Sequence, residues 1–125
     1  RTYQQERKYK FYININIMTK TEGNRLIAEF IGAKRFQEKE NTFSYELYGL
    51  LDCINDEDNE QHFFLPEDMK FHVSWDWLIP AVQSIEETVG GVPKQMLYLS
   101  LYNTKNEIHD AVIDFIREYN EENQT

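Results

Sequence analysis

This chain of 125 residues has a single cysteine, Cys53, which excludes both an internal disulfide and a zinc site built from several cysteines. No run of 18 apolar residues occurs, so no membrane-spanning helix is predicted, and no signal peptide is recognised in the residues present. The glycine-rich motifs that bind nucleotide phosphates are missing, as is the Gly-x-Ser-x-Gly pattern of serine hydrolases. We therefore predict no cofactor, and a cysteine-poor chain of this kind is typical of the cytoplasm.

Acidic residues outnumber basic ones by 22 to 13, and the formal net charge is −9 at pH 7. Binding to the phosphates of DNA or RNA needs clustered lysine and arginine, so direct nucleic-acid binding is excluded. Hydrophobic residues make up 41% of the chain, which is enough to form a folded core. The composition predicts one domain whose protein partner carries a basic surface.

Residues 1–17 allow two interpretations. The first methionine is Met18, and every residue from Lys8 to Ile17 is of a type that can be encoded with only A and T, which favours translated upstream sequence. Alternatively, Phe11 to Ile17 alternate apolar and polar residues with the period of a half-buried strand. The segment is either a read-through extension or an extra N-terminal strand.

Hydrophobic periodicity and cap signals predict a mixed fold for residues 18–120, with 121–125 as a frayed tail. The predicted elements are a helix from Asn24 to Ile31, a strand from Phe43 to Ile54, a loop at 55–61, a strand from Met69 to Val73, a helix from Ser74 to Val89, a strand from Gln95 to Tyr102 and a helix from Lys105 to Asn120. In the first helix Asn24 is the predicted N-cap and Gly32 the stop signal. This order predicts an α+β domain of two layers, with about three helices packed on one face of a small, mostly antiparallel sheet.

Both tryptophans of the chain flank one carboxylate, in the order Trp75, Asp76 and Trp77. On a helix, residues 75 and 77 point about 200° apart, so only one of them can face the core fully. We predict that Trp77 is buried and that Trp75 covers the edge of the core. Trp75 and Asp76 are then candidate protein-contact residues, because tryptophan is favoured at binding hot spots.

No catalytic or metal site is predicted. The three histidines, His62, His72 and His109, do not have the short spacing of a zinc motif. His72 and Asp76 lie four residues apart across a predicted strand-to-helix junction, a spacing that carries little information about a catalytic pair. Cys53 has no neighbouring histidine and is predicted to be a buried, inert thiol.

The last predicted helix carries a narrow stripe of carboxylates. Its members are Glu107, Asp110, Asp114, Glu118 and Glu121. The stripe is centred more than 90° from the apolar stripe of the same helix, so it faces solvent. Five charges over roughly 21 Å give one per about 5 Å, against one per about 1.7 Å in duplex DNA, so this helix alone is too sparse to imitate a duplex. The stripe is either a solubilising face, a protein-binding face, or part of a larger mimic of nucleic acid.

Three segments resemble a group of short, functionally uncharacterised proteins of bacteriophages and prophages. They are Asn24 to Gly32, Lys70 to Glu86 and Lys105 to Glu121, which together cover 43 of 125 residues. The middle segment is the most specific, and it departs from the expected pattern at Ile79, Gln83 and Ser84, where the group has Met, Glu and Lys. The resemblance begins after Met18 and implies a phage origin and a bacterial cytoplasm, but no catalytic residue.

Three hypotheses follow for the function. The leading one is a non-enzymatic accessory protein that binds a host or phage protein through its acidic face and the aromatic edge around Trp75. The second is a nucleic-acid mimic that blocks a basic groove of a host protein, and the third and weakest is a small enzyme that uses His62, His72 or Asp76. The sequence makes no prediction about oligomeric state.

Overall fold

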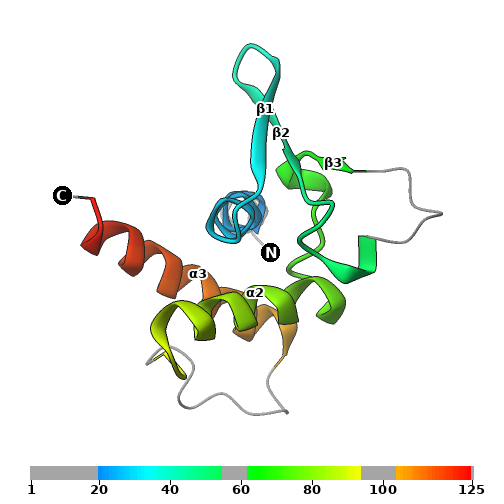
Figure 1. Ribbon diagram of the computed structural model, residues 1–125. Helices are drawn as coiled ribbons and strands as arrows, with labels where there is room; N and C mark the ends of the chain where they lie inside the picture. The colour runs from blue at the N-terminus through cyan, green and yellow to red at the C-terminus, as the bar shows by residue number, and fades with distance from the viewer. Residues whose placement is uncertain (1–19, 55–61, 94–103, 125) are drawn as a thin grey trace, which may run out of the picture.

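The computed structural model describes residues 20–54, 62–93 and 104–124. They form three helices and a three-stranded antiparallel sheet, which confirms the predicted α+β class (Figure 1). After an N-terminal helix at residues 20–30, the elements are β1 (Lys34–Lys39), β2 (Thr42–Glu46), η1 (Asp52–Ile54), β3 (Phe63–Phe64), η2 (Pro66–Asp68), α2 (Trp75–Val89) and α3 (Lys105–Glu122). Three predicted segments lie outside the described residues, namely 1–17, the loop at 55–61 and the strand from Gln95 to Tyr102.

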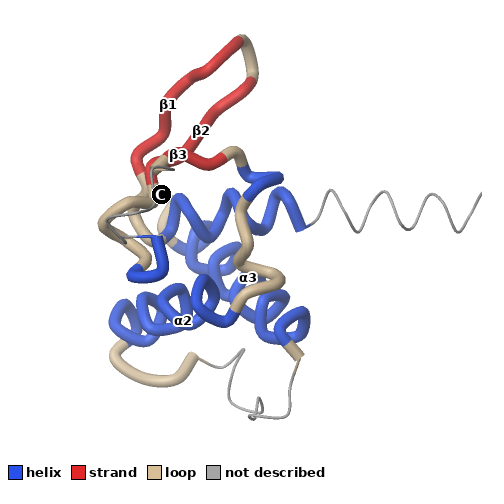
Figure 2. The backbone as a smooth tube through the Cα atoms, turned by 90° about the vertical axis from the view of Figure 1, so that its right-hand side faces the viewer, coloured by secondary structure: helices blue, strands red, loops and turns tan. Residues whose placement is uncertain are grey.

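The N-terminal helix lies between the sheet and the other two helices. In Figures 1 and 2, which differ by a quarter turn, the β1–β2 hairpin rises above this helix, and α2 and α3 lie below it. The strands follow the order β1-β2-β3, and Tyr45 on β2 pairs with Arg35 on one side and Phe64 on the other. The helices therefore gather on one side of the sheet, and the core fills the space between them.

The prediction that Asn24 caps the first helix was wrong. The helix is already formed at residue 20, and Asn24 is a buried residue in its interior with 1% of its surface exposed. The stop signal at Gly32 is confirmed, because this residue has a φ of +94°, which a glycine adopts without strain. The amide of Ala33 then bonds back to the carbonyl of Ala28 at 2.9 Å, which closes the helix end.

Strand β1, which forms a hairpin with β2, is the longest element that the sequence did not predict. Every residue of β1 is exposed. A strand with no buried face does not need the alternation of apolar and polar residues by which a strand is recognised in a sequence. The hairpin turns at Glu40 and Asn41, between the paired residues Lys39 and Thr42. Asn41 has a φ of +63°, and asparagine is one of the few side chains that tolerate this conformation.

Two predicted strands differ from the structure. The strand predicted from Phe43 to Ile54 ends at Glu46, because Gly49 turns the chain with a φ of +89° before η1 begins. The strand predicted from Met69 to Val73 was wrong, although its alternation of buried and exposed residues is present. Met69 and Phe71 are buried, but this segment forms a turn, and the carbonyl of Met69 accepts a hydrogen bond from the side chain of Asn24 instead of from a neighbouring strand.

Helices α2 and α3 agree closely with their predictions. Ser74 is the N-cap residue of α2, with extended backbone, and Gly90 ends the helix with a φ of +73°. Pro80 does not delay the start of α2, which is helical from Trp75. Helix α3 reaches Glu122 rather than ending near Asn120, so the first residues of the predicted tail are helical.

The closest approach between the N-terminal helix and α3 depends on Gly23. A Cβ built on Gly23 would overlap the Cδ1 atom of Ile113 and come within 3.0 Å of the Cε1 atom of His109. We expect Gly23→Ala to lower the free energy of unfolding by about 1–2 kcal/mol, because overpacking costs about 1–3 kcal/mol and the better helix propensity of alanine offsets part of it. Urea unfolding followed by circular dichroism measures the change.

Gly91→Ala is the matched control for this substitution. No atom lies within 4 Å of a Cβ built on Gly91, so its effect is expected to stay within about 0.5 kcal/mol. Equal unfolding midpoints for Gly23→Ala and the natural chain would contradict the tight helix contact.

Candidate functional site

The start of α2 exposes a small apolar patch. Trp77 is 5% exposed and packs in the core, whereas Trp75 is 38% exposed, which confirms the predicted division between the two tryptophans. Ile79 lies one turn after Trp75 and is 48% exposed, and Val73, just ahead of the helix, is 54% exposed. We call Val73, Trp75 and Ile79 the Trp75 patch. Three large apolar side chains are thus in contact with solvent at one end of a helix.

The carboxylate stripe does not continue the Trp75 patch. The ammonium of Lys105, the first residue of α3, lies over the ring of Trp75 at 5.6 Å from its centroid. Asp114, at the centre of the stripe, is nine residues further on, which is roughly 180° around the helix at 100° per residue. The patch and the stripe, which the leading hypothesis joined into one surface, therefore lie on different sides of α3.

The carboxylates of the stripe differ in their surroundings. Asp110, Asp114 and Glu121 are exposed, and Glu118 is half-buried. Glu107 has a structural role, because its carboxylate accepts hydrogen bonds from the amide and hydroxyl of Thr104 at 3.1 and 3.0 Å in a capping box. Asp110, Asp114 and Glu121 are thus the exposed carboxylates of the stripe that lie outside the capping box.

Asp76 contributes to the same region through its backbone. Pro80 has no N–H, so the carbonyl of Asp76 loses its helical partner. The thiol of Cys53 in η1 donates to that carbonyl at 3.7 Å. Partial desolvation beside α2 and the nearby Asp76 carboxylate raise the pKa of the thiol, so it keeps the proton that it donates. Cys53 is exposed, not buried as predicted, and it ties η1 to α2.

The histidines do not form a catalytic site with Asp76. His62 stacks on Tyr48 with ring centroids 4.3 Å apart. His72 turns towards Asn24 and His109, whose ring is centred 5.9 Å from its own. His109 is 0% exposed, so no substrate can reach it. Among the described residues, no group of three or more His, Cys, Asp or Glu side chains could hold a metal ion.

A buried polar cluster forms around Asn24, and sequence reasoning missed it. We call Asn24, His72 and His109 the Asn24 cluster. The side-chain NH2 group of Asn24 lies 3.2 Å from the carbonyl of Met69, 3.4 Å from the carbonyl of Pro66 and 3.1 Å from Nδ1 of His72. Its oxygen lies 3.0 Å from Nε2 of His109. One side chain therefore connects the N-terminal helix to α3 and to the segment that leads into α2.

The hydrogen bonds of Asn24 determine the proton positions on both rings. The carbonyl of Met69 can only accept, so the NH2 group of Asn24 faces it and the oxygen of Asn24 faces His109. Nε2 of His109 must then carry the proton, and Nδ1 of His72 must be the acceptor. Nδ1 of His109 is buried and has no hydrogen-bond partner among the residues that the structure describes.

Both rings of the cluster are held in their neutral form. Burial, followed by the charges of His72 and Lys20, lowers the pKa of His109 to about 4. Burial and then Lys20 also lower the pKa of His72. A buried imidazole without a carboxylate beside it is less basic than one in water, because the charged form loses its hydration.

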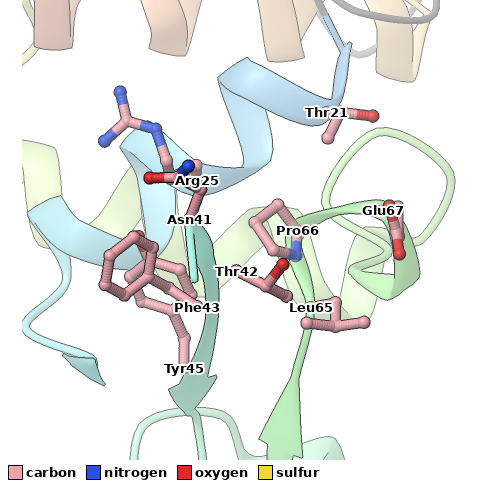
Figure 3. Close-up of a pocket in the computed structure, with 9 residues that line it drawn as sticks. All are labelled: Thr21, Arg25, Asn41, Thr42, Phe43, Tyr45, Leu65, Pro66 and Glu67. Atoms are coloured by element: carbon pink, nitrogen blue, oxygen red, sulfur yellow. The ribbon is translucent and has the colours of Figure 1, made fainter. Parts of the chain in front are cut away.

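A pocket of about 250 Å³ lies between the N-terminal helix, the hairpin and the segment ahead of η2 (Figure 3). It is lined by Thr21, Arg25, Asn41, Thr42, Phe43, Tyr45, Leu65, Pro66 and Glu67. A second hollow of about 420 Å³ shares Thr42 and Leu65 with it and extends to Ser44 and Phe63. The first pocket is smaller than most small-molecule sites, which begin near 300 Å³.

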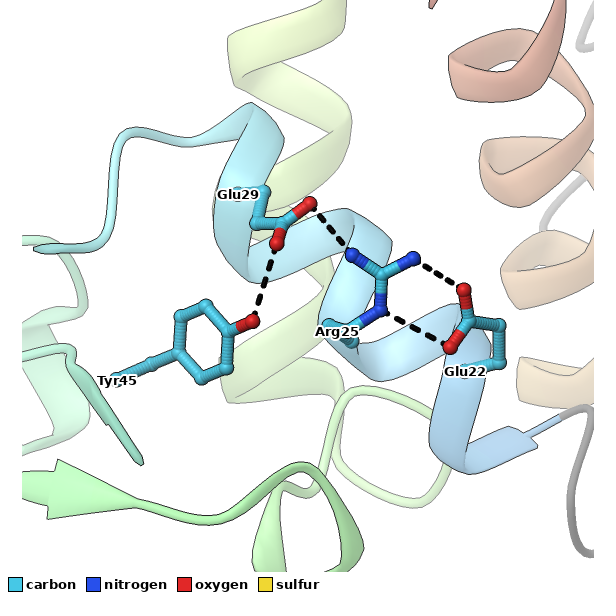
Figure 4. Close-up of polar contacts among 4 residues, drawn as sticks. All are labelled: Glu22, Arg25, Glu29 and Tyr45. Atoms are coloured by element: carbon cyan, nitrogen blue, oxygen red, sulfur yellow. Dashed lines mark hydrogen bonds and ion pairs between the residues drawn. The ribbon is translucent and has the colours of Figure 1, made fainter. Parts of the chain in front are cut away.

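The one guanidinium of the first pocket is already bound (Figure 4). Nη1 of Arg25 donates to Glu29 at 2.8 Å, and its Nε donates to Glu22 at 2.9 Å. The hydroxyl of Tyr45 donates to the other oxygen of Glu29 at 3.0 Å, and burial together with this carboxylate raises the pKa of Tyr45. Hydrogen bonding to Arg25 lowers the pKa of Glu22. With two carboxylates on one guanidinium, the pocket does not favour an anionic ligand.

Comparison with family models, with curated proteins and with solved structures finds no match for this chain. The resemblance to phage proteins therefore stays a prediction. Within the described residues, none of the helices combines the length and the apolar character needed to cross a membrane. Of the surfaces predicted from the sequence, the Trp75 patch and the carboxylate stripe are both exposed in the described part of the chain.

Proposed function

We propose that this protein is a non-enzymatic binding module that holds another protein through the Trp75 patch. The observation that carries the proposal is the exposure of Trp75 and Ile79 one turn apart on α2, while Trp77 between them is buried. Exposed tryptophan next to aliphatic side chains is typical of binding hot spots, because its large ring buries much area at low entropic cost.

The charges around the patch indicate the chemistry of the partner. At the patch itself Asp76 is exposed beside Trp75 and the ammonium of Lys105 lies over the Trp75 ring, whereas Glu86 and Glu87 are exposed near the far end of α2; the whole chain carries −9. Such a surface fits a partner that offers an apolar pocket rimmed by lysine or arginine. If the resemblance to phage proteins holds, this partner is a host or phage protein in a bacterial cytoplasm.

Trp75→Ala and Ile79→Ala test the proposal. The full chain is immobilised, and binding of bacterial proteins to the natural chain and to each variant is compared. We expect the affinity for the specific partner to fall by about 30-fold or more for Trp75→Ala, as for a hot-spot residue. Val89→Ala is the matched control, because Val89 is an exposed apolar residue at the other end of α2. Equal loss in all three variants, or in none, would contradict a contact through the patch.

The carboxylate stripe supports a second candidate function, the nucleic-acid mimic. Asp110, Asp114 and Glu121 are exposed along one side of α3, where they are available to a basic groove. Affinity for such a partner should fall as the salt concentration rises from 50 to 500 mM, because salt screens exposed charges, and it should also fall in Asp114→Asn. Contact through the Trp75 patch should change little under either treatment.

A further inference from the structure

The Asn24 cluster joins three segments that are far apart in the sequence. Asn24 belongs to the N-terminal helix, His109 belongs to α3, and His72 lies in the segment between η2 and α2. We propose that the Asn24 cluster is a pH-sensitive latch, which holds the N-terminal helix against α3 and against residues 66–73 at neutral pH and releases it on acidification. The latch does not depend on the binding surface proposed above.

Protonation of His72 removes an acceptor that Asn24 uses. Nδ1 of His72 lies 3.1 Å from the NH2 group of Asn24, which also faces the carbonyls of Met69 and Pro66, and because an amide nitrogen cannot accept, Nδ1 can face it favourably only when it carries no proton. In the imidazolium form both ring nitrogens carry a proton, so two donors would face each other across this distance. His72 is half-buried, so a proton from solvent can reach it more readily than it can reach His109.

Protonation of His109 creates a buried charge without a partner. Its Nε2–H is already donated to Asn24, so an added proton must go to Nδ1, which is buried and faces no acceptor within the described part of the chain. Uncompensated burial of an ion is costly, and the fold avoids this cost by opening.

The charged groups around the cluster oppose protonation further. Lys20 comes from the N-terminal helix, one turn before Asn24, and its ammonium donates to Asn106 on α3 at 2.6 Å. Its positive charge disfavours a second cation at either ring. In the segment itself Glu67, Asp68 and Lys70 are exposed, and on α3 the nearest carboxylate in sequence, Asp110, is exposed as well.

The direction of the pH effect follows from the lowered pKa values. In the open state both rings return to the ordinary histidine pKa of about 6.5. Between pH 6.5 and about 4 the open state therefore binds more protons than the closed one, and the closed state loses stability as the pH falls. For His109 alone, the ratio of closed to open protein should fall by about 20-fold between pH 7 and pH 5.

The test replaces both rings by side chains that keep the hydrogen bonds but do not titrate. In His72→Asn the amide oxygen can take the place of Nδ1, and in His109→Gln the amide nitrogen can take the place of Nε2. Urea unfolding of the full chain at pH 7 and pH 5 gives the equilibrium constant for the natural chain, the double variant and the control His62→Gln. His62 stacks on Tyr48 outside the cluster, so this control removes a histidine but leaves the latch intact.

We expect the natural chain and His62→Gln to lose stability from pH 7 to pH 5 by about 20-fold more than the double variant. An equal pH response in the double variant would overturn the latch. If the double variant does not fold, nitrogen chemical shifts of the natural chain decide the question. Both rings should be the Nε2–H tautomer at pH 7, and His109 should still be neutral in folded protein at pH 5. The opposite tautomer at either ring, or a charged His109 at pH 5, would overturn the proposal.

Discussion

Trp77→Ala is expected to lower the free energy of unfolding by about 3–5 kcal/mol, the usual cost of removing a buried aromatic side chain. Trp77 is 5% exposed, and its ring packs edge-on against Phe64 at 5.1 Å and against Phe71 at 5.2 Å between centroids. These contacts join α2 to β3 and to the segment that precedes α2. Loss of the ring therefore leaves a cavity where three parts of the chain meet.

Trp75→Ala is the matched comparison, because it removes the same side chain two residues away. Trp75 is partly exposed and its ring contacts Lys105, so its removal is expected to cost less than about 1 kcal/mol. Urea unfolding should be followed by circular dichroism, since each variant loses one of the two fluorescent tryptophans. Similar losses in the two variants would mean that Trp77 does not hold the core together.

Asn24→Ala is expected to lower the free energy of unfolding by about 2–5 kcal/mol, although it removes only one small side chain. The Nε2–H of His109 and the carbonyl of Met69 would both lose their partner, and each buried group without a hydrogen bond costs about 1–3 kcal/mol. The contact with His72 would be lost as well. Thermal or urea unfolding at pH 7 measures the effect.

Asn106→Ala is the control for this second substitution. Asn106 also joins the N-terminal helix to α3, by accepting a hydrogen bond from Lys20, but this bond is exposed to water. Its loss is expected to stay within about 0.5 kcal/mol, because water replaces the partner. If Asn24→Ala were as mild as Asn106→Ala, the buried amide would not be what connects these elements.

Helices α2 and α3 were predicted well because their signals are local. Each has an apolar stripe with helical spacing, a cap residue at its start, and in α2 a glycine at its end. The β1–β2 hairpin was missed because β1 is exposed along its whole length, so nothing in its sequence alternates. Met69 to Val73 alternates correctly, but its backbone finds a side-chain donor, Asn24, in place of a strand.

The candidate site, like the fold, was predicted from the sequence only where its features are local. The burial of Trp77 and the exposure of Trp75 follow from their separation on one helix, which the sequence contains. Their separation from the carboxylate stripe depends on how α2 crosses α3, and no spacing within either helix reports that angle. Asn24 gave a misleading signal, because asparagine near the start of an apolar helical stripe is typical of an N-cap.

The amino-acid sequence by itself determined the α+β class, the extent of α2 and α3, the buried and exposed faces of those helices, and the acidic character of the surface. The tertiary structure alone decided that Asn24, His72 and His109 meet, that the Trp75 patch and the carboxylate stripe face different ways, and that Cys53 reaches the carbonyl freed by Pro80. The reason is physical. Helical faces and caps depend on neighbours within one turn, whereas a buried polar contact depends on where distant segments come together as the core packs.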